Sequence, residues 1–407
     1  MNRKKPSMNR RELIEAGGSA LLCGSLAGRL YAAPATGPRL LLVFLRGGYD
    51  STNFLIPYSS SFYYESRPNI AVPRPDPASH TGALALDADW ALAPAVRESI
   101  GAMYGRREAA FVPFAGTDDL SRSHFETQDS IELGQPMGGA RNYRSGFLGR
   151  LAAALSGSPG GGSSISFTDA LPLAFAGTET VPNISLKNVG KPPFDERQAK
   201  ILSDMYAGHH LESAVSGGLE LRQEVAQELA SDINTANRNA INTKGFELEA
   251  ERVGRLMGDK YRIGFIDVGG WDTHVGEGAA QGTLANNLGS LGRGLQALAQ
   301  SLGAEWSNTV VVVLSEFGRT FRENGNRGTD HGHGTVYWVL GGSINGGAIL
   351  GAQQRLARGT LFQDRDYPVL NDYRAILGGL FRSMWGLSAA QCSQIFTQTT
   401  PLDLKLV

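Results

Sequence analysis

A continuous apolar run near residue 310 constrains the fold of this chain more than any other feature. The segment 309–314 (TVVVVL) is mostly β-branched and has the length of a buried strand in a parallel sheet. It stops abruptly before Glu316, which places a carboxylate at the carboxyl end of the strand, where open α/β sheets bind their ligands. Asp330, His331 and His333 follow in the next loop and supply oxygen and nitrogen donors that divalent metals accept. The sequence therefore predicts one wall of a metal site here.

Further strands and helices alternate along the chain. Strands are predicted at 39–45, 109–114, 165–175, 184–186, 261–268 and 336–340, and helices at 94–104, 197–206, 211–236, 240–257, 279–302 and 372–385. The helix at 279–302 carries a leucine stripe with helical spacing. No repeat of 20–50 residues interrupts this alternation, which indicates an α/β fold with a mainly parallel central sheet.

Length and composition limit the class of protein. The chain has 407 residues, 42% of them hydrophobic, which is enough to bury a sizeable core. We expect residues 36–407 to form one domain, with a helical insertion or crossover region at about 190–260. The net charge is −1 and no basic stripe follows the N-terminus, so a nucleic-acid partner is not expected.

The first 35 residues have the order of an export signal. A basic opening with Arg10 and Arg11 precedes a weakly apolar run from 16 to 28, and a small-residue zone follows at 32–35. This order predicts a twin-arginine signal peptide, recognition by the twin-arginine translocase and a periplasmic or otherwise exported protein. The alternative is a Sec signal with an incidental arginine pair. The apolar run is too short to span a bilayer, and no transmembrane segment is expected after signal removal.

The two cysteines add one restriction. Cys23 lies within the predicted signal peptide, and Cys392 is the other cysteine of the chain. Cleavage would leave one cysteine, so a disulfide framework is not expected in the mature protein even in an oxidising compartment.

Metal-type donors follow four of the predicted strands. They are Asp50 after the strand at 39–45, His124 after 109–114, Asp272 and His274 after 261–268, and Glu316, Asp330, His331 and His333 after 309–314. Four of the seven histidines lie in these loops, which argues for a shared metal centre. Mixed carboxylate and imidazole ligands favour Zn, Mn or Fe over an all-oxygen calcium site, and the donors suffice for one or two divalent ions. Asp50 alone would equally suit a helix or turn cap.

The segment from Ser121 to Glu126 has two interpretations. Ser123 and Glu126 have the spacing of a capping box, so Ser123 could be only the N-cap of a helix. A helix N-terminus also suits an anion, so Ser123 or Ser121 could instead be a nucleophile or a metal-facing hydroxyl. Arg122 and His124 would then assist.

Several of these segments together resemble a known family. The arginine pair at 10–11 and the segments 45–50 (LRGGYD), 121–125 (SRSHF), 270–274 (GWDTH), 315–319 (SEFGR) and 329–333 (TDHGH) resemble the domain of unknown function 1501 family. That family is similar to the alkaline phosphatase and sulfatase superfamily. The resemblance covers nearly the whole mature chain and implies an alkaline-phosphatase-like, three-layer α/β/α sandwich with a metal centre at the strand ends.

The resemblance also implies roles for individual residues. Asp50 would bind metal, Ser121 or Ser123 would be the nucleophile, and Asp272 and His274 would bind one ion. The superfamily's Ser-Asp-His-Gly type motif reads Ser315-Glu316-Phe317-Gly318 here, so Phe317 stands where a histidine ligand is expected. Asp330, His331 and His333 would supply the missing ligands.

Two functions from different classes follow from these features. The first is an exported metal-dependent hydrolase or transferase acting on a small-molecule or glycan ester of phosphate or sulfate, or on a related anionic group. Arg122 or Arg319 would hold the anion, because a guanidinium pairs well with planar oxyanions. The alternative is a non-catalytic exported binding or structural module with a structural metal site. A redox role has no cofactor motif to support it, and the sequence does not predict an oligomeric state.

Overall fold

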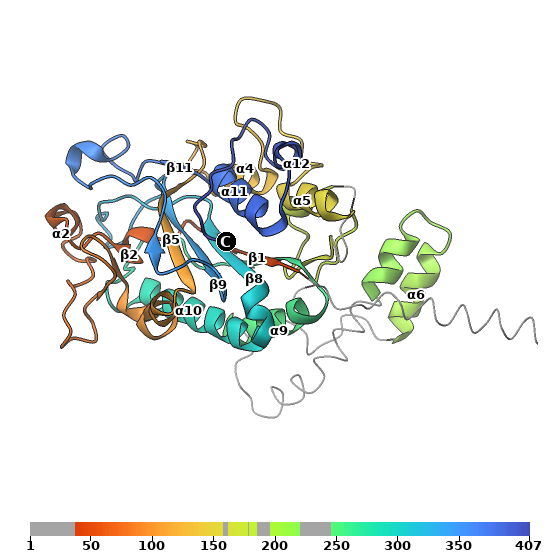
Figure 1. Cartoon of the computed structure of the whole chain (residues 1–407), viewed down its shortest axis with the longest axis horizontal. Helices are drawn as coiled ribbons and strands as arrows, with labels where there is room; N and C mark the ends of the chain where they lie inside the picture. The colour runs from red at the N-terminus through yellow and green to blue at the C-terminus, as the bar shows by residue number, and fades with distance from the viewer. Residues whose placement is uncertain (1–36, 158–161, 178, 185–195, 220–245) are drawn as a thin grey trace, which may run out of the picture.

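A computed structural model describes residues 37–157, 162–177, 179–184, 196–219 and 246–407 of the chain (Figure 1). The predicted signal peptide at 1–35 lies outside these residues. So do 220–236 and 240–245, which belong to the two helices predicted before residue 257. None of the described helices is both long and apolar enough to span a lipid bilayer.

An eight-stranded sheet forms the centre of the protein. Its order is β10 (Ala348–Ile349), β5 (Ala109–Gly116), β9 (Thr335–Gly341), β8 (Thr309–Ser315), β1 (Arg39–Leu45), β7 (Ile263–Val268) and β6 (Ser164–Ser166), and β11 (Asn371–Asp372) also pairs with β5. β9 is antiparallel to β5 and β8, and the other pairings are parallel. The mainly parallel sheet predicted from the sequence is confirmed.

Both faces of the sheet are buried. Along β1, Leu41, Val43 and Leu45 belong to one hydrophobic core, and Leu40, Leu42 and Phe44 belong to a second core on the other face. Helices α9 (Phe246–Asp259) and α10 (Thr283–Leu302) cover the first face, whereas α4 (His124–Leu133), α5 (Phe147–Leu155), α11 (Tyr373–Trp385) and α12 (Ala389–Ile395) cover the second (Figure 1). The predicted three-layer α/β/α sandwich is therefore confirmed.

Smaller elements complete the described structure. They are the second sheet β2–β4–β3 (Leu55–Ile56, Ala91–Leu92, Leu84–Ala85), the α-helices α2 (Ser61–Ser66), α3 (Ala102–Gly105) and α6 (Glu196–Tyr206), the π-helix η3 (Arg97–Gly101), and the 3-10 helices η1 (Ser51–Asn53), η2 (Pro94–Val96), η4 (Leu173–Phe175), η5 (Gly303–Asn308) and η6 (Arg358–Thr360). The helix predicted at 94–104 is thus three consecutive turns of different type. Of the predicted insertion at 190–260, α6 and α9 are described.

Some element boundaries differ from the sequence-based prediction. α10 begins at Thr283 and not at 279, because Gly282 has a positive φ of 124° that ends any helical path before it. After the last helix predicted from the sequence, at 372–385, the chain forms α12, whose start is capped by the Ser388 hydroxyl and the Gln391 amide. The segment predicted as a strand at 165–175 contains only the end of β6 and then a 3-10 helix. Helix α5 was not predicted.

The topology brings the candidate loops to one edge of the sheet. β1, β5, β7 and β8 run in the same direction, so their carboxyl ends lie together. β9 runs in the opposite direction and therefore begins at this edge, directly after the loop that contains His331. β1 lies between β7 and β8, and strands on both of its sides deliver loops to this edge, as at ligand sites of open α/β sheets.

Candidate metal centre

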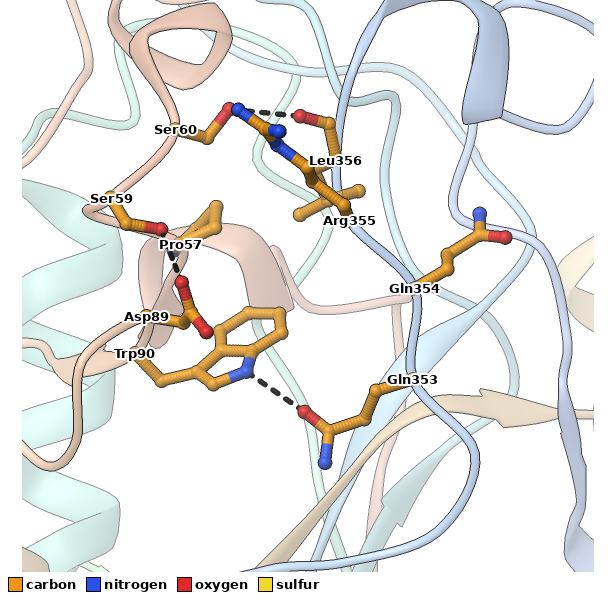
Figure 2. Close-up of a pocket in the computed structure, with 9 residues that line it drawn as sticks. All are labelled: Pro57, Ser59, Ser60, Asp89, Trp90, Gln353, Gln354, Arg355 and Leu356. Atoms are coloured by element: carbon orange, nitrogen blue, oxygen red, sulfur yellow. Dashed lines mark hydrogen bonds between the residues drawn. The ribbon is translucent and has the colours of Figure 1, made fainter.

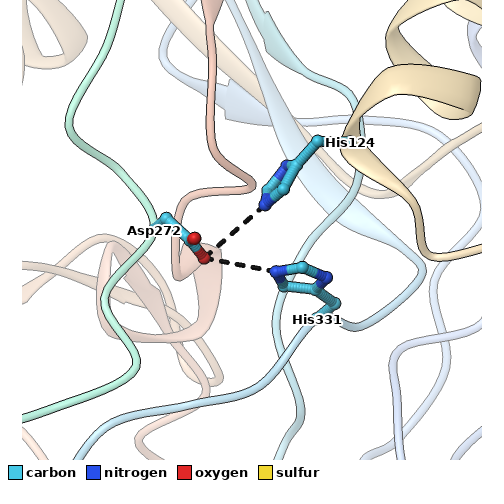
Figure 3. A group of neighbouring side chains, drawn as sticks. All are labelled: His124, Asp272 and His331. Carbon is cyan, nitrogen blue, oxygen red and sulfur yellow. Dashed lines mark hydrogen bonds and ion pairs between the residues drawn. The ribbon is translucent and has the colours of Figure 1, made fainter.

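Three side chains from three different loops meet at this edge (Figure 3). His124 is the first residue of α4, Asp272 follows β7, and His331 precedes β9. One ligand atom from each of these residues lies within 4.8 Å of those of the other two. The sequence predicted all three as site residues, and the parallel sheet explains why they converge.

The Oδ1 atom of Asp272 is the centre of the group. It lies 3.0 Å from Nε2 of His274, 3.3 Å from Nε2 of His331 and 3.6 Å from Nε2 of His124. The two Nε2 atoms of His274 and His331 are 3.1 Å apart. His124, Asp272 and His331 therefore form a close group of three donors, and His274 lies beside Asp272 and His331.

The outer nitrogen of each ring is bonded to an oxygen. Nδ1 of His124 lies 2.8 Å from Oε1 of Glu316, Nδ1 of His331 lies 2.9 Å from the carbonyl oxygen of Arg122, and Nδ1 of His274 lies 3.2 Å from Oδ1 of Asp330. A carbonyl or an ionised carboxylate can only accept a hydrogen bond, so each Nδ1 carries the proton. In the neutral rings every Nε2 then presents its lone pair toward Asp272, as in metal sites whose histidines are oriented by oxygen acceptors.

A cation would suit this arrangement. Nε2 of His124 is buried and has no hydrogen-bond partner, and the Nε2 atoms of His274 and His331 lie 3.1 Å apart. Ligand atoms bound tetrahedrally at zinc-type distances lie about 3.3 Å from one another, close to the separations around Asp272. The donor set therefore fits a divalent metal ion.

Asp272 is half-exposed and ionised. Its side chain is 46% exposed, so solvent or a ligand reaches the group from that side. Burial alone would raise the pKa of Asp272, but the charge of Arg319 and the hydrogen bond it donates, at 2.7 Å, keep that pKa below its usual range. Arg319 is fully buried, which makes it a fixed positive charge beside the centre.

Glu316 supports the centre and does not belong to the close group of donors. Its Oε1 accepts hydrogen bonds from His124, from the Gln128 amide and from the backbone N–H of Gly47. Burial would raise the pKa of Glu316, but these bonds hold it below its usual range, and the bond to Glu316 raises the pKa of His124. The sequence predicted Glu316 as a metal ligand, whereas the structure places it behind a histidine ring. Gln128 was not predicted, although its position one turn after His124 is a usable signal.

Asp50 is not brought into the group either. Its carboxylate is fully buried and paired with the guanidinium of Arg67 through Oδ1 and Oδ2, and Oδ1 also accepts the N–H of Thr52. Asp50 thus caps the 3-10 helix η1, which is the second interpretation that the sequence left open. Arg67 lies in no motif, so sequence reasoning had no signal for this pairing.

The predicted nucleophile segment lies beside the centre. Ser123 is the N-cap of α4 by position, but its side chain makes no cap hydrogen bond, so the predicted capping box is wrong. The Ser121 hydroxyl lies 3.3 Å from that of Thr127 and accepts the N–H of Ser123.

Arg122 contributes its backbone and not its side chain. Its φ is +52°, a strained value for a non-glycine residue, and its carbonyl accepts the Nδ1 proton of His331. The guanidinium turns away to the buried Asp366, at 2.7 Å, and to Gln363. The sequence offered Arg122 or Arg319 to hold an anion, and in the structure the guanidinium of Arg122 is already paired with Asp366.

Two glycines after β1 allow the loops to approach one another. Gly47 has φ +123°, and a Cβ there would lie 2.9 Å from the backbone nitrogen of Asp272. Gly48 has φ +60°, and a Cβ there would lie 2.4 Å from the ring of Phe317. That ring packs 4.9 Å from His124, between centroids, so Phe317 buttresses the histidines at the place where the resemblance implied a ligand.

His333 and Asp330 also lie outside the close group. Asp330 orients His274, and burial would raise the pKa of Asp330 but the Asn324 and His274 bonds lower it. The His333 ring packs against Phe362, with 5.0 Å between ring centroids. Burial, helped by the charge of Arg122, lowers the pKa of His333 to about 4.

His333 should make stability depend on pH in the metal-free protein. The unfolded chain takes up this proton near pH 6.5, whereas the folded protein resists it down to about pH 4. The free energy of unfolding should therefore fall by about 2 kcal/mol between pH 7 and pH 5 from this group alone. In urea unfolding, a His333→Phe variant should not show this fall in the free energy of unfolding between pH 7 and pH 5. A His80→Gln variant, changed at an exposed histidine, should retain it. Equal pH dependence in wild type and His333→Phe would contradict the prediction.

A separate hollow lies at the small sheet (Figure 2). It encloses about 510 Å³ and is lined by Pro57, Ser59, Ser60, Asp89, Trp90, Gln353, Gln354, Arg355 and Leu356. The Trp90 indole N–H donates to Gln353 at 2.9 Å, and the Ser59 hydroxyl donates to Asp89 at 2.8 Å. None of the predicted site residues lines this hollow.

Two solved structures show weak similarity to this chain. One is Ps i-CgsB in complex with k-i-k-neocarrahexaose, with 9% identity, 88% of this chain and 74% of that chain covered, and a TM-score of 0.37. The other is a protein in the alkaline phosphatase superfamily from Vibrio parahaemolyticus, with 12% identity, 76% and 62% coverage, and a TM-score of 0.32. At these scores neither likeness carries an argument about activity.

Sequence comparison identifies the family. No curated protein matches the chain. The profile of one protein family, described as "Protein of unknown function (DUF1501)", matches residues 38–396. This range includes all the strands of the central sheet and every residue of the centre around Asp272. The chain therefore belongs to the DUF1501 family.

Proposed function

We propose that the chain is an exported metal-dependent hydrolase that cleaves a phosphate or sulfate ester or a related anionic group. The observation that carries this proposal is the set of three imidazoles whose Nε2 atoms face the half-exposed carboxylate of Asp272. The export signal at 1–35 is part of the proposal and rests on the sequence alone.

His124, Asp272 and His331 would hold the ion and leave a fourth position open, beside which His274 lies. Two imidazoles and a carboxylate suit Zn, Mn or Fe. When bound, such an ion would polarise the ester oxygen and lower the pKa of a bound water or hydroxyl. We propose one ion, because the buried guanidinium of Arg67 already neutralises Asp50, the carboxylate expected at a second one.

The chain's own residues provide orientation and charge. Glu316, Asp330 and the Arg122 carbonyl fix the three rings before any ligand arrives, which is the preorganisation that catalysis needs. Arg319 adds a fixed positive charge, and α4 points its N-terminus at the same place. These features favour a negatively charged group bound next to Asp272.

Exposure separates this proposal from a structural metal site. A structural zinc site is closed by four protein ligands, whereas a catalytic site keeps one position open. With its side chain 46% exposed, Asp272 leaves the group accessible, so a small-molecule or glycan ester could reach it. This accessibility is the reason to rank hydrolysis above a non-catalytic binding module.

Turnover of simple esters tests the proposal and the choice of serine. Protein loaded with Zn, Mn or Fe should hydrolyse an aryl phosphate or aryl sulfate, and Ser123→Ala should lower kcat by at least about a hundredfold if Ser123 is the nucleophile. Metal content should not change. Ser121→Ala is the matched comparison, since the Ser121 hydroxyl is already bonded to the Thr127 hydroxyl and to the N–H of Ser123.

Two results would contradict parts of this proposal. Loss of turnover in Ser121→Ala but not in Ser123→Ala would show that the wrong serine was chosen. Stoichiometric metal without turnover of any phosphate or sulfate ester would favour the binding module.

A further inference from the structure

A buried charged cluster lies beneath the two loops that carry the centre. It consists of Asp50, Arg67 and Glu277, whose side chains are fully buried. Arg67 donates to both oxygens of Asp50, and its Nη1 lies 3.9 Å from Oε1 of Glu277. Arg67 also donates to the carbonyl oxygens of Thr320 and Phe321, directly after Arg319.

Glu277 connects this cluster to both loops at once. Its Oε2 accepts a hydrogen bond from the hydroxyl of Thr273 at 2.8 Å and another from the hydroxyl of Thr329 at 2.9 Å. Thr273 lies between Asp272 and His274, and Thr329 lies two residues before His331. The N–H of Thr329 also donates to the carbonyl of Thr273 at 3.1 Å, so the two loops touch at this point.

The cluster holds one more carboxyl than it has guanidinium groups. Asp50 and Glu277 both face the single guanidinium of Arg67, so one of the two carboxyls has no full countercharge. Burial, together with the charge of Asp50, raises the pKa of Glu277, whereas Arg67 overcomes burial to lower that of Asp50. Burial therefore favours the protonated form of Glu277, and its Oε2 accepts from the two threonines.

We propose that Glu277 is a positioning residue that sets the separation of the Asp272–His274 loop and the His331 loop through Thr273 and Thr329. The inference rests on the proposed metal centre and adds a residue that touches neither metal nor substrate. The uncharged carboxyl of Glu277 connects the two loops by hydrogen bonds. A side chain that offers a donor toward Asp50 and an acceptor toward the two threonines should therefore replace it.

Glutamine and alanine at position 277 test this directly. Glu277→Gln supplies an N–H to Asp50 and a carbonyl to the two threonines, so its zinc affinity should stay within about twofold of wild type. Glu277→Ala removes both threonine contacts and should weaken zinc binding by about tenfold or more, as supporting-residue changes at metal sites do. Zinc affinity is measured by competition with a chromogenic chelator.

Two further variants separate positioning from loss of stability. The double variant Thr273→Val/Thr329→Val deletes only the two hydroxyls and should weaken zinc binding as Glu277→Ala does, which keeps the test valid if Glu277→Ala does not fold. Leu380→Ala opens a cavity on the other face of the sheet and should lower the melting temperature without changing zinc affinity. Wild-type affinity in Glu277→Ala or in the double valine variant would overturn the inference, and so would equal weakening by Gln and Ala.

A metal-free measurement distinguishes failure of this inference from failure of the proposed function. Ring nitrogen NMR signals of His274 and His331 should shift in Glu277→Ala and in the double valine variant but not in Glu277→Gln. If wild type binds no metal, the proposed function fails and these signals still decide whether Glu277 positions the loops. Unchanged signals in Glu277→Ala would overturn the inference.

Discussion

Purified Asp272→Ala protein should contain no stoichiometric metal after dialysis, whereas wild type should retain it. Asp272 supplies the atom that faces all three Nε2 atoms, so its removal leaves three imidazoles with no common anionic partner. A free-ion concentration of 100 times the Kd stabilises a protein by about 2.7 kcal/mol, and the variant should lose that increment. Elemental analysis gives the metal content, and melting with and without chelator gives the increment.

The stabilisation gained on metal binding is a better readout than the absolute free energy of unfolding. Asp272→Ala also leaves the buried Arg319 without its carboxylate partner, which lowers the stability of the metal-free protein on its own. Asp364→Ala is the matched control, because Asp364 is an exposed carboxylate that pairs with Arg322 and belongs to no part of the donor group. Equal metal content in wild type and Asp272→Ala would remove the proposed centre.

Arg67→Met should destabilise the metal-free protein by about 3–5 kcal/mol. Asp50 and Arg67 are both fully buried, and deleting one partner of a buried ion pair leaves an uncompensated charge in the interior. The loss should be smaller near pH 4 than at pH 7, because protonation of Asp50 removes the buried charge. Urea unfolding at both pH values measures the effect.

A double-mutant cycle identifies the cause of this loss. Asp50→Asn/Arg67→Met contains no unpaired charge and should recover much of the stability lost in Arg67→Met. Arg322→Met removes an arginine of an exposed pair and should cost less than about 1 kcal/mol. An equally small loss of stability in Arg67→Met and Arg322→Met would show that Asp50 has a partner other than Arg67. Asp50 would then again be a candidate metal ligand.

The sequence predicted the strands and the sheet edge that hold the site well, because these depend on local patterns. The β-branched run at Thr309 and the apolar run at Arg39 became central, adjacent strands, and the leucine stripe of α10 is buried. Parallel strands in such a sheet must end at one edge, so donors directly after them had to converge. His124, Asp272 and His331 were predicted on this ground, and the structure places them together.

The sequence could not tell which of the carboxylates at this edge would face the metal centre. Asp50, Asp272 and Glu316 all follow strands and look equivalent, yet Asp50 pairs with Arg67, Glu316 orients His124, and Asp272 faces three rings. Each outcome depends on a partner from a distant loop. Glu277 was overlooked for the same reason, because its contacts to Thr329 and Arg67 have no counterpart in local spacing.

The amino-acid sequence by itself determined the mainly parallel α/β sheet, the edge where the donors gather, and His124 and His331 among them, because strand length, hydrophobic period and residue position after a strand are local properties. Only the tertiary structure decided which carboxylate receives a guanidinium, which one orients a ring and which one stays half-exposed. That division follows from burial: a carboxylate removed from water must take the nearest donor in space, and the fold sets which donor that is.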